Sequence, residues 1–189
     1  MINCYMKYVK LTWLDLEKDC LTLAKKIKKR NIVFDKIVAI ARGGLVFSRI
    51  LSDLLDLPIS NIVISSYKDL KQQKEPEIIE ESTANFDNKN LLIVDEVSDT
   101  GKTFRRALSY FKNKNIKRIY TASPYIKPKT LFIPDFWVKK IDAWIVFPYD
   151  IRETYQAFVK NFSSSQKAKA MMKKIGFKDW EINFTNFIK

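Results

Sequence analysis

Residues 91–103 are the segment that most strongly constrains the fold of this chain. They run Leu-Leu-Ile-Val-Asp-Glu-Val-Ser-Asp-Thr-Gly-Lys-Thr, so four apolar residues are followed directly by two acids and a short polar turn. A short apolar run of this kind is typical of a strand that is buried on both faces. Asp95 and Glu96 leave this strand at its carboxyl end, which is the edge where open α/β sheets bind ligands.

The same strand–turn–helix pattern recurs along the chain and predicts its architecture. The expected strands cover residues 36–40, 59–65, 91–94 and 116–123, and the expected helices cover residues 12–30, 45–55, 103–113 and 152–175. Thr12 and Asp15 form a capping box for the first helix. This alternation implies an α/β fold with a doubly wound, largely parallel sheet flanked by helices. We expect one domain over residues 1–189, with a core at about 30–125 and a small hood and C-terminal helical extension at about 126–189.

The absence of histidine limits the chemistry that is open to the chain. It excludes Ser-His-Asp and Cys-His catalysis and histidine-ligated zinc. Lysine and arginine outnumber the acids by 34 to 21, which gives a net charge of +13. This excess favours a polyanionic partner, which is a nucleic acid, a membrane surface or a phosphorylated metabolite.

The two cysteines and the apolar pattern indicate the compartment. Cys4 and Cys20 are too few for a disulfide framework and suit free thiols in a reducing environment, although one disulfide between them is an alternative. The first residues lack the apolar centre of a signal peptide, and no apolar run reaches about 18 residues. We therefore expect a cytoplasmic protein that does not span a membrane.

The turn at residues 98–103 combines hydroxyls, backbone amides and a glycine at the start of a helix, which suits a phosphate group. Gly101-Lys102-Thr103 matches the end of the Walker motif, but Glu96 stands where that motif needs a glycine. We therefore reject a nucleotide-triphosphatase loop. The paired acids followed by Asp-Thr-Gly-x-Thr instead resemble the ribose-phosphate motif of type I phosphoribosyltransferases.

This resemblance, which covers residues 36 to 155, implies a role for each residue of the motif. Asp95 and Glu96 would hold the ribose hydroxyls of phosphoribosyl pyrophosphate and, through those hydroxyls or water, help to retain Mg²⁺. Asp99 would be the general base beside the purine N7. The 5′-phosphate would be bound by Ser98, Asp99, Thr100, Gly101, Lys102 and Thr103. Alternatively, the first two acids cap a strand and Asp99 caps the next helix, but three acids so close to a buried strand are costly without a cation or hydroxyls.

The turn at residues 41–44 is a second anion site, because it also joins a buried strand to a helix. In the resembling family this turn is the pyrophosphate loop, which implies that Arg42 and Gly43 bind pyrophosphate and that Arg42 assists catalysis. The family often has a cis peptide here, which would be the Ala41–Arg42 bond. The alternative is an ordinary turn with a solvated arginine.

Residues 65–81 are polar and charged and predict a mobile surface loop. The resemblance implies that Ser66 and Tyr67 head a lid over the reacting centre, with Tyr67 taking part in catalysis. Ser66 and Lys68 would then contact pyrophosphate. The alternative is a surface hairpin with no such role.

The purine site is indicated by Lys127-Pro128 and by residues 142–150, which resemble the 6-oxopurine branch, the xanthine-guanine and hypoxanthine-guanine phosphoribosyltransferases. Lys127 would face the carbonyl at purine C6, which favours oxopurines over adenine. Trp144 and Ile145 would pack on the base, and Asp150 would lie near C2. The alternative is that the aromatic residues belong to the core.

The resulting hypothesis is Mg²⁺-dependent transfer of phosphoribosyl to N9 of guanine, xanthine or hypoxanthine by a homodimer or homotetramer. Two departures from the family pattern are Asp95-Glu96 in place of Asp-Asp and Lys102 in place of glycine. The rival is a regulator that keeps this fold to sense phosphoribosyl pyrophosphate and binds nucleic acid. It would use the cations of the C-terminal helix, which are Lys160, Lys167, Lys169, Lys173 and Lys174.

Overall fold

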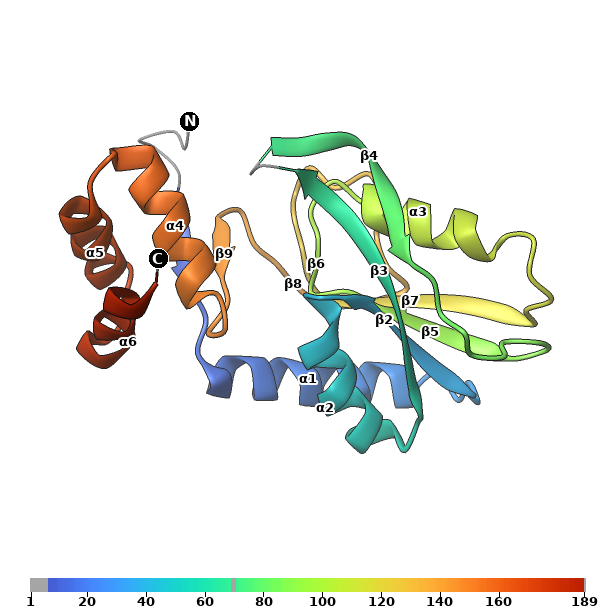
Figure 1. Ribbon diagram of the computed structural model, residues 1–189. Helices are drawn as coiled ribbons and strands as arrows, with labels where there is room; N and C mark the ends of the chain where they lie inside the picture. Colours follow the sequence, from blue (N-terminus) through green and yellow to red (C-terminus); the bar gives the residue numbers. More distant parts are fainter. Residues whose placement is uncertain (1–6, 69–70, 189) are drawn as a thin grey trace. The chain divides into compact units, whose positions relative to one another are not determined.

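The computed structural model describes residues 7–68 and 71–188 (Figure 1). The chain divides into two compact units. The core unit comprises residues 16–141, and the terminal unit comprises residues 1–15 with 142–189. That the two form a single domain stays a prediction.

The core unit is built on a sheet whose strands follow the order β4-β3-β2-β5-β7-β6, with β8 also paired to β7. Every neighbouring pair is parallel except β3 with β4. The prediction of a largely parallel, doubly wound sheet is therefore confirmed. The strands are β2 (Lys36–Ala41), β3 (Ile59–Lys68), β4 (Lys71–Glu80), β5 (Asn90–Val94), β6 (Val97–Ser98), β7 (Arg118–Ile126) and β8 (Phe136–Lys140).

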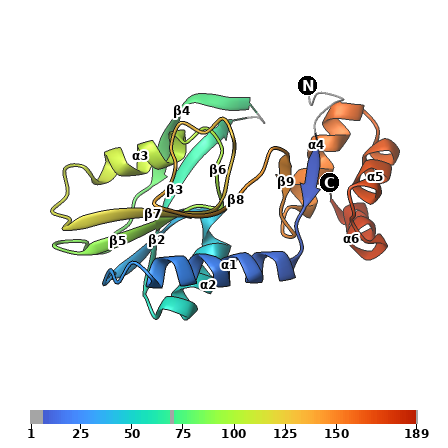
Figure 2. The same cartoon turned by 180° about the vertical axis from the view of Figure 1, so that it is seen from behind.

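Helices cover both faces of this sheet (Figures 1 and 2). Helices α1 (Trp13–Lys28) and α2 (Gly44–Leu55) lie on one face, and α3 (Lys102–Phe111) lies on the other. The inner strands are apolar on both faces for this reason. On the α3 side, Phe104 and Phe111 pack with Val38, Ile62 and Ile93 of three neighbouring strands.

The capping box predicted at the start of α1 is present. The Thr12 backbone N–H donates to Asp15 Oδ2 at 2.8 Å, and the Asp15 N–H donates to Thr12 Oγ1 at 3.1 Å. Each side chain thus satisfies an amide that the first turn of a helix leaves without an intrahelical partner.

A buried polar cluster joins α1 to β7 and β8, and the sequence analysis did not find it. Asp19 is 3% exposed and accepts hydrogen bonds from the Tyr125 hydroxyl at 2.8 Å and from Lys139 Nζ at 2.9 Å. A carboxylate on the apolar face of a helix is tolerated only when it is paired in this way. The neighbouring Cys20 is a buried free thiol, whereas Cys4 lies outside the described residues.

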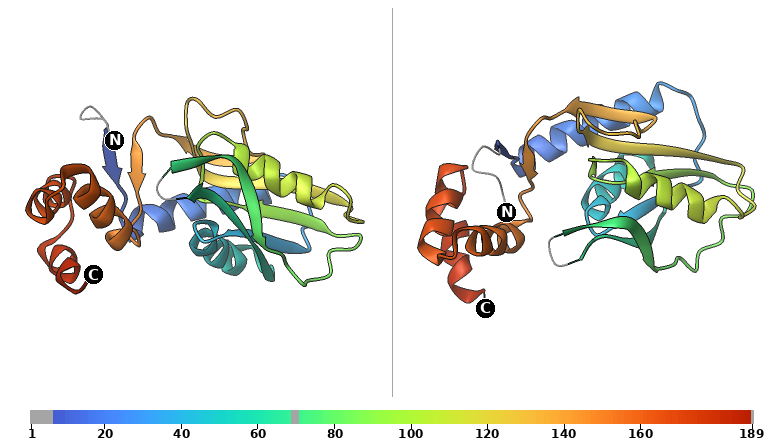
Figure 3. Two further views of the ribbon diagram at one scale, coloured as in Figure 1. Left: turned by 45° about the horizontal axis from the view of Figure 1, so that its top comes forward. Right: turned by 90° about the horizontal axis from the view of Figure 1, so that it is seen from above.

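The predicted loop at residues 65–81 is instead part of an antiparallel hairpin. Strand β3 continues to Lys68, and β4 follows on the outer edge of the sheet, paired from Val63–Glu80 to Lys68–Lys71 (Figure 3). On this edge strand Glu75, Glu77 and Glu80 are exposed, and charged residues at an edge discourage pairing with another chain. Pro76 is buried and Ile78 packs against the core, so one face of the strand turns inward. The loop prediction was therefore wrong about the backbone.

The terminal unit pairs β1 (Tyr8–Lys10) in parallel with β9 (Trp144–Val146) and adds a group of short helices. These are α4 (Ile151–Phe162), α5 (Ser165–Lys174), α6 (Asp179–Phe184) and a 3₁₀ turn at Thr185–Phe187. Their core contains Tyr155, Phe158, Met172 and Phe177. Among the described residues, no helix has the length and apolarity needed to cross a bilayer.

The single helix predicted over residues 152–175 is wrong, because the chain breaks at Ser163 and Ser164. Ser163 adopts a left-handed conformation with φ 50°, which ends α4. Ser164 is extended, and its side chain accepts a hydrogen bond from the Lys167 N–H at 3.3 Å. A serine at this position is a favourable start for a new helix.

Candidate active site

Two adjacent acids end β5 inside the core unit. Asp95 is 6% exposed, its N–H donates to the Ala122 carbonyl at 3.1 Å, and its Oδ1 accepts from the Glu96 N–H at 3.0 Å. Burial, and then the charge of Glu96, raise the pKa of Asp95 well above its usual range. Among the described residues, Glu96 Oε2 is buried and has no hydrogen-bond partner. This pair of carboxyl groups is therefore suited to a cation or to hydroxyl donors from a ligand.

The turn after β2 lies directly against this pair. The two strands are parallel neighbours, with Val38 opposite Ile93 and Ala39 opposite Val94, so both turns emerge at the same edge of the sheet. The Glu96 carboxylate occupies the space where a Cβ on Gly43 would lie. The Ala41–Arg42 peptide is cis, as the resemblance led us to expect. The structure thus brings the Arg42–Gly43 turn and the Asp95–Glu96 pair together.

The turn at residues 97–103 continues the same edge and begins α3. Gly101 has φ 83°, a conformation that favours glycine, and a Cβ there would also overlap Phe132. The Lys102 N–H points to Thr100 Oγ1 at 3.5 Å. The first amides of a helix have no intrahelical acceptor, so this turn and the start of α3 offer donors to an anion.

Asp99 lies in this turn with its side chain 28% exposed. Its Oδ1 is 3.5 Å from Nζ of Lys129, a residue that the sequence analysis did not select. The lysine side chain is itself 72% exposed, so this is a surface ion pair of small energetic value. Asp99 is consequently open to a second partner.

Residues 130–132 hold the turn in place from the other side. The Leu131 N–H donates to the Thr100 carbonyl at 3.2 Å, and the buried Ser98 hydroxyl contacts Thr130 Oγ1 at 2.9 Å and the Phe132 carbonyl at 2.7 Å. The hydroxyl of Ser98 is therefore engaged within the protein. That this residue also contacts phosphate stays a prediction.

The comparisons with known proteins agree with this geometry. Residues 11–156 match the model of the phosphoribosyl transferase domain family. The chain belongs to the phosphoribosyltransferase family. A xanthine-guanine phosphoribosyltransferase of Desulfotalea psychrophila is 31% identical over 160 residues, which are 83% of this chain and 95% of the relative. A second, from Nitratidesulfovibrio vulgaris, is 29% identical over 154 residues, which are 80% of this chain and 90% of that protein.

Solved structures of phosphoribosyltransferases show the same fold. A purine phosphoribosyltransferase from Pyrococcus horikoshii Ot3 is 35% identical, with a TM-score of 0.67 over 76% of this chain and 94% of its own. A xanthine-guanine-hypoxanthine phosphoribosyltransferase from Helicobacter pylori, at 24% identity, has a TM-score of 0.65 over 82% and 98% of the two chains. The second likeness is evidence of the fold alone.

The residues expected to bind the purine are divided between the two units of this phosphoribosyltransferase. Lys127 directly follows β7 in the core unit, where its N–H donates to the Ser98 carbonyl at 3.0 Å. In the terminal unit, Trp144 is 47% exposed and Ile145 only 7%, and Asp150 Oδ2 accepts from the Phe147 N–H at 3.2 Å. A common purine site for the two sets stays a prediction.

The residues expected to form the lid of the phosphoribosyltransferase can be placed only by their backbone. Ser66, Tyr67 and Lys68 end β3, next to the tip of the hairpin. Their side chains lie outside the described residues. Their contacts with pyrophosphate, and the part of Tyr67 in catalysis, stay predictions.

Proposed function

We propose that this protein transfers the phosphoribosyl group of phosphoribosyl pyrophosphate to N9 of a 6-oxopurine, which is guanine, xanthine or hypoxanthine. The bond from C1′ to the pyrophosphate oxygen breaks, the bond from C1′ to N9 forms, and the purine loses one proton. The observation that carries the proposal is the contact between the Glu96 carboxylate and Gly43. It joins a site for ribose hydroxyls to a site for pyrophosphate, and the transfer needs both.

Each part of the site has a distinct role in this proposal. Asp95 and Glu96 hold the ribose hydroxyls and favour the positive charge that develops at C1′. The turn at residues 98–103 and the start of α3 bind the 5′-phosphate. Arg42 and Gly43 bind the leaving pyrophosphate, and Asp99 accepts the purine proton, with no need for histidine.

The carboxyl pair also fits the Mg²⁺ that the family implies. Asp95 and Glu96 are adjacent carboxyl groups, and among the described residues Glu96 Oε2 is buried without a hydrogen-bond partner. Mg²⁺ is commonly held by one or two carboxylates together with water and substrate phosphates. In this proposal Asp95 and Glu96 retain the ion through ribose hydroxyls or water, and the ion supplies positive charge to the pyrophosphate.

The choice of a 6-oxopurine rests on Lys127 and on the names of the relatives. An ammonium donates to a carbonyl at C6 but opposes the amino group of adenine. The xanthine-guanine enzymes support this class of substrate, and the purine enzyme of Pyrococcus horikoshii supports a purine in general. Trp144 and Ile145 as the wall of the base site, and Asp150 near C2, belong to the same proposal.

A direct assay tests the proposed function. The protein is mixed with Mg²⁺, phosphoribosyl pyrophosphate and, in turn, guanine, xanthine, hypoxanthine and adenine, and the nucleoside monophosphate is quantified. We expect product from at least one oxopurine and far less from adenine, with turnover lost in the Asp99→Ala variant. Absence of nucleotide with every base would overturn the proposal. Light scattering on the same sample tests for a homodimer or homotetramer.

The nucleic-acid-binding regulator is the weaker candidate, because the terminal unit already engages part of its positive charge. Lys173 is paired with Asp179 at 2.9 Å, and Lys169 donates to Asn186 at 2.6 Å. Exposed charged residues of this kind are usually solvated. Binding to DNA or RNA that weakens steeply with salt would favour the regulator.

A further inference from the structure

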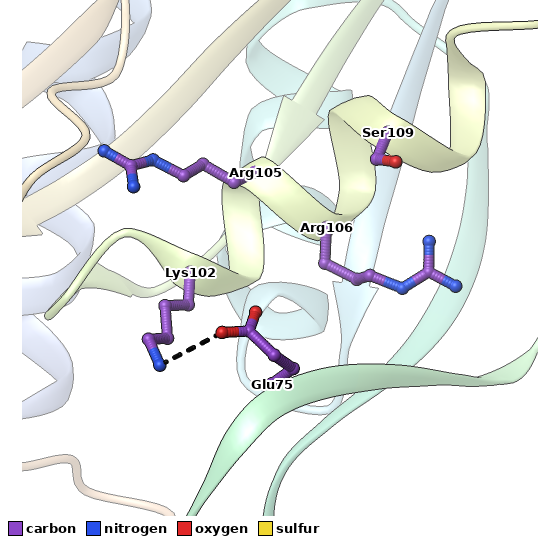
Figure 4. Close-up of a pocket in the computed structure, with 5 residues that line it drawn as sticks. All are labelled: Glu75, Lys102, Arg105, Arg106 and Ser109. Carbon is purple, nitrogen blue, oxygen red and sulfur yellow. Dashed lines mark hydrogen bonds and ion pairs between the residues drawn. The ribbon is translucent and has the colours of Figure 1, made fainter.

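A hollow of about 250 Å³ lies between α3 and β4 in the core unit. Figure 4 shows the residues that line it, which are Glu75, Lys102, Arg105, Arg106 and Ser109. Four of these belong to α3, and only Glu75 comes from the hairpin. The backbone of Lys102 belongs to the proposed 5′-phosphate turn, but its side chain extends from the helix toward Glu75 (Figure 4). The hollow is therefore lined by side chains that the proposed transfer reaction does not use.

The three cations that line the hollow differ in the contacts they make. Lys102 Nζ lies 3.5 Å from the Glu75 carboxylate, whose side chain is 82% exposed, so this ion pair is weak. Arg105 points away from the hollow and donates to the Leu131 carbonyl at 2.7 Å. Among the described residues, no hydrogen bond or ion pair is found for the Arg106 guanidinium.

The spacing along α3 places two cations of the hollow on the same side of the helix. Lys102, Arg106 and Ser109 are four and three residues apart, so they share one side of the helix. Two like charges at a spacing of four residues repel each other and destabilise the helix. A phosphate-bearing anion would remove this repulsion, since a guanidinium donates to two phosphate oxygens at once and an ammonium binds as a point charge.

We propose that this hollow is a second anion-binding site, which takes a diphosphate or another phosphate-bearing anion between Lys102 and Arg106, with the Ser109 hydroxyl as a further donor. The anion competes with Glu75 for the Lys102 ammonium. An anion bound in the hollow therefore weakens the Lys102–Glu75 ion pair between α3 and the β3–β4 hairpin. The proposed catalytic site binds pyrophosphate through Arg42 instead, so the two sites are separable by mutation.

Calorimetric titration with inorganic pyrophosphate at low ionic strength tests this proposal. We expect two classes of site in the unaltered protein. Arg106→Gln should weaken one class by about tenfold to a hundredfold, the loss expected for one charged hydrogen-bond partner. Glu75→Gln should strengthen that class by about two- to fivefold, because it removes the competing carboxylate. Arg49→Gln, on the exposed side of α2, has the same change of charge and should alter neither class.

The outcomes separate this site from the proposed catalytic one. Arg42→Gln should weaken only the other class of site. If Arg106→Gln binds pyrophosphate as the unaltered protein does, or if Arg49→Gln weakens it equally, the second site is refuted. If Arg42→Gln alone has no effect, the assignment of the catalytic pyrophosphate site fails while the hollow stands.

Discussion

Two adjacent glycines, Gly43 and Gly44, allow the stability of the core unit to be separated from the geometry of its site. An added Cβ on Gly44 would overlap the Val94 carbonyl oxygen and lie 3.1 Å from Asp95 Cα, both of which are backbone atoms of a buried strand end. The three atoms nearest to an added Cβ on Gly43 all belong to the Glu96 carboxylate, which is the end of a flexible side chain. The two substitutions to alanine are chemically identical, but they meet different obstacles.

The expected costs follow from these contacts. Gly44→Ala should lower the free energy of unfolding by about 1–3 kcal/mol, the usual cost of overpacking a rigid interior, out of a total of about 5–15 kcal/mol. Gly43 has φ −58° and ψ −44°, which alanine adopts freely. Gly43→Ala should therefore change stability by less than about 1 kcal/mol. By moving Glu96, it should nevertheless lower kcat/KM by about a hundredfold.

Amide hydrogen exchange in β5 reports on the stability of the core unit alone, and nucleotide formation reports on the site. Glu96→Ala is the control. In a protein that already carries Glu96→Ala, adding Gly43→Ala should cause no further loss of kcat/KM, whereas adding Gly44→Ala should still lower the stability. The reasoning is refuted if Gly44→Ala is as stable as the unaltered protein. Equal loss of stability in both alanine variants would also refute it, since Glu96 would then not be free to move.

Four further predictions concern single side chains. Asp99→Ala should lower kcat by about 10²–10⁴-fold with phosphoribosyl pyrophosphate binding retained, and an unchanged rate in a steady-state assay would remove its assignment. Asp95→Asn should raise the thermal midpoint while it abolishes turnover, because burial opposes the charged form of this side chain; a lower midpoint in scanning calorimetry would contradict this. Lys127→Met should lower kcat/KM for guanine by about tenfold or more and leave the weak rate with adenine unchanged in the same assay. Burial, followed by the charge of the preceding carboxylate, raises the pKa of Cys20 to about 12. In a Cys4→Ser background, this thiol should therefore resist alkylation at pH 8 until urea unfolds the protein, and rapid labelling of the folded protein would show the burial to be wrong. The free energy of unfolding should fall between about pH 9 and pH 12, because only the thiol of the unfolded protein loses its proton in that range.

The parts of the fold that could be predicted are those where local signals agree with the tertiary structure. The strand at residues 91–94 is apolar throughout because helices cover both faces of the sheet, and the Thr12–Asp15 capping box acts within a single turn. The edge strand β4 has no apolar run of this kind, because only one of its faces, with Pro76 and Ile78, turns inward, and its partner is the preceding strand. The break at Ser163 and Ser164 did carry a signal, since serine is a strong helix-capping residue, but the basic residues on both sides were interpreted as one helix.

In the candidate site, too, some residues could be predicted from the sequence and others could not. Asp95, Glu96 and Asp99 could be found from the sequence, because their position after a buried strand has no stabilising explanation of its own. The inward direction of the Ser98 hydroxyl could not be found, since it depends on residues 130–132. Those residues are positioned by the stacking of Phe132 on Phe104, with ring centroids 5.3 Å apart, a contact between residues distant in sequence.

The difference between the predictable and the unpredictable residues of the site has a physical cause, which connects the stability of the site with its function. Asp95 is buried beside a second carboxylate, and Glu96 Oε2 lacks a partner among the described residues, so both groups make the protein without ligand less stable. Gly43 allows this arrangement, because the Glu96 carboxylate lies where any other residue would place a Cβ. Hydroxyls or a cation supplied by a ligand would satisfy these same groups, so binding energy is available at the atoms where the folded chain is least satisfied. Side chains that oppose stability are visible in a sequence because they break its hydrophobic pattern, whereas the residues that hold them in place follow the pattern and are recognised only in the structure.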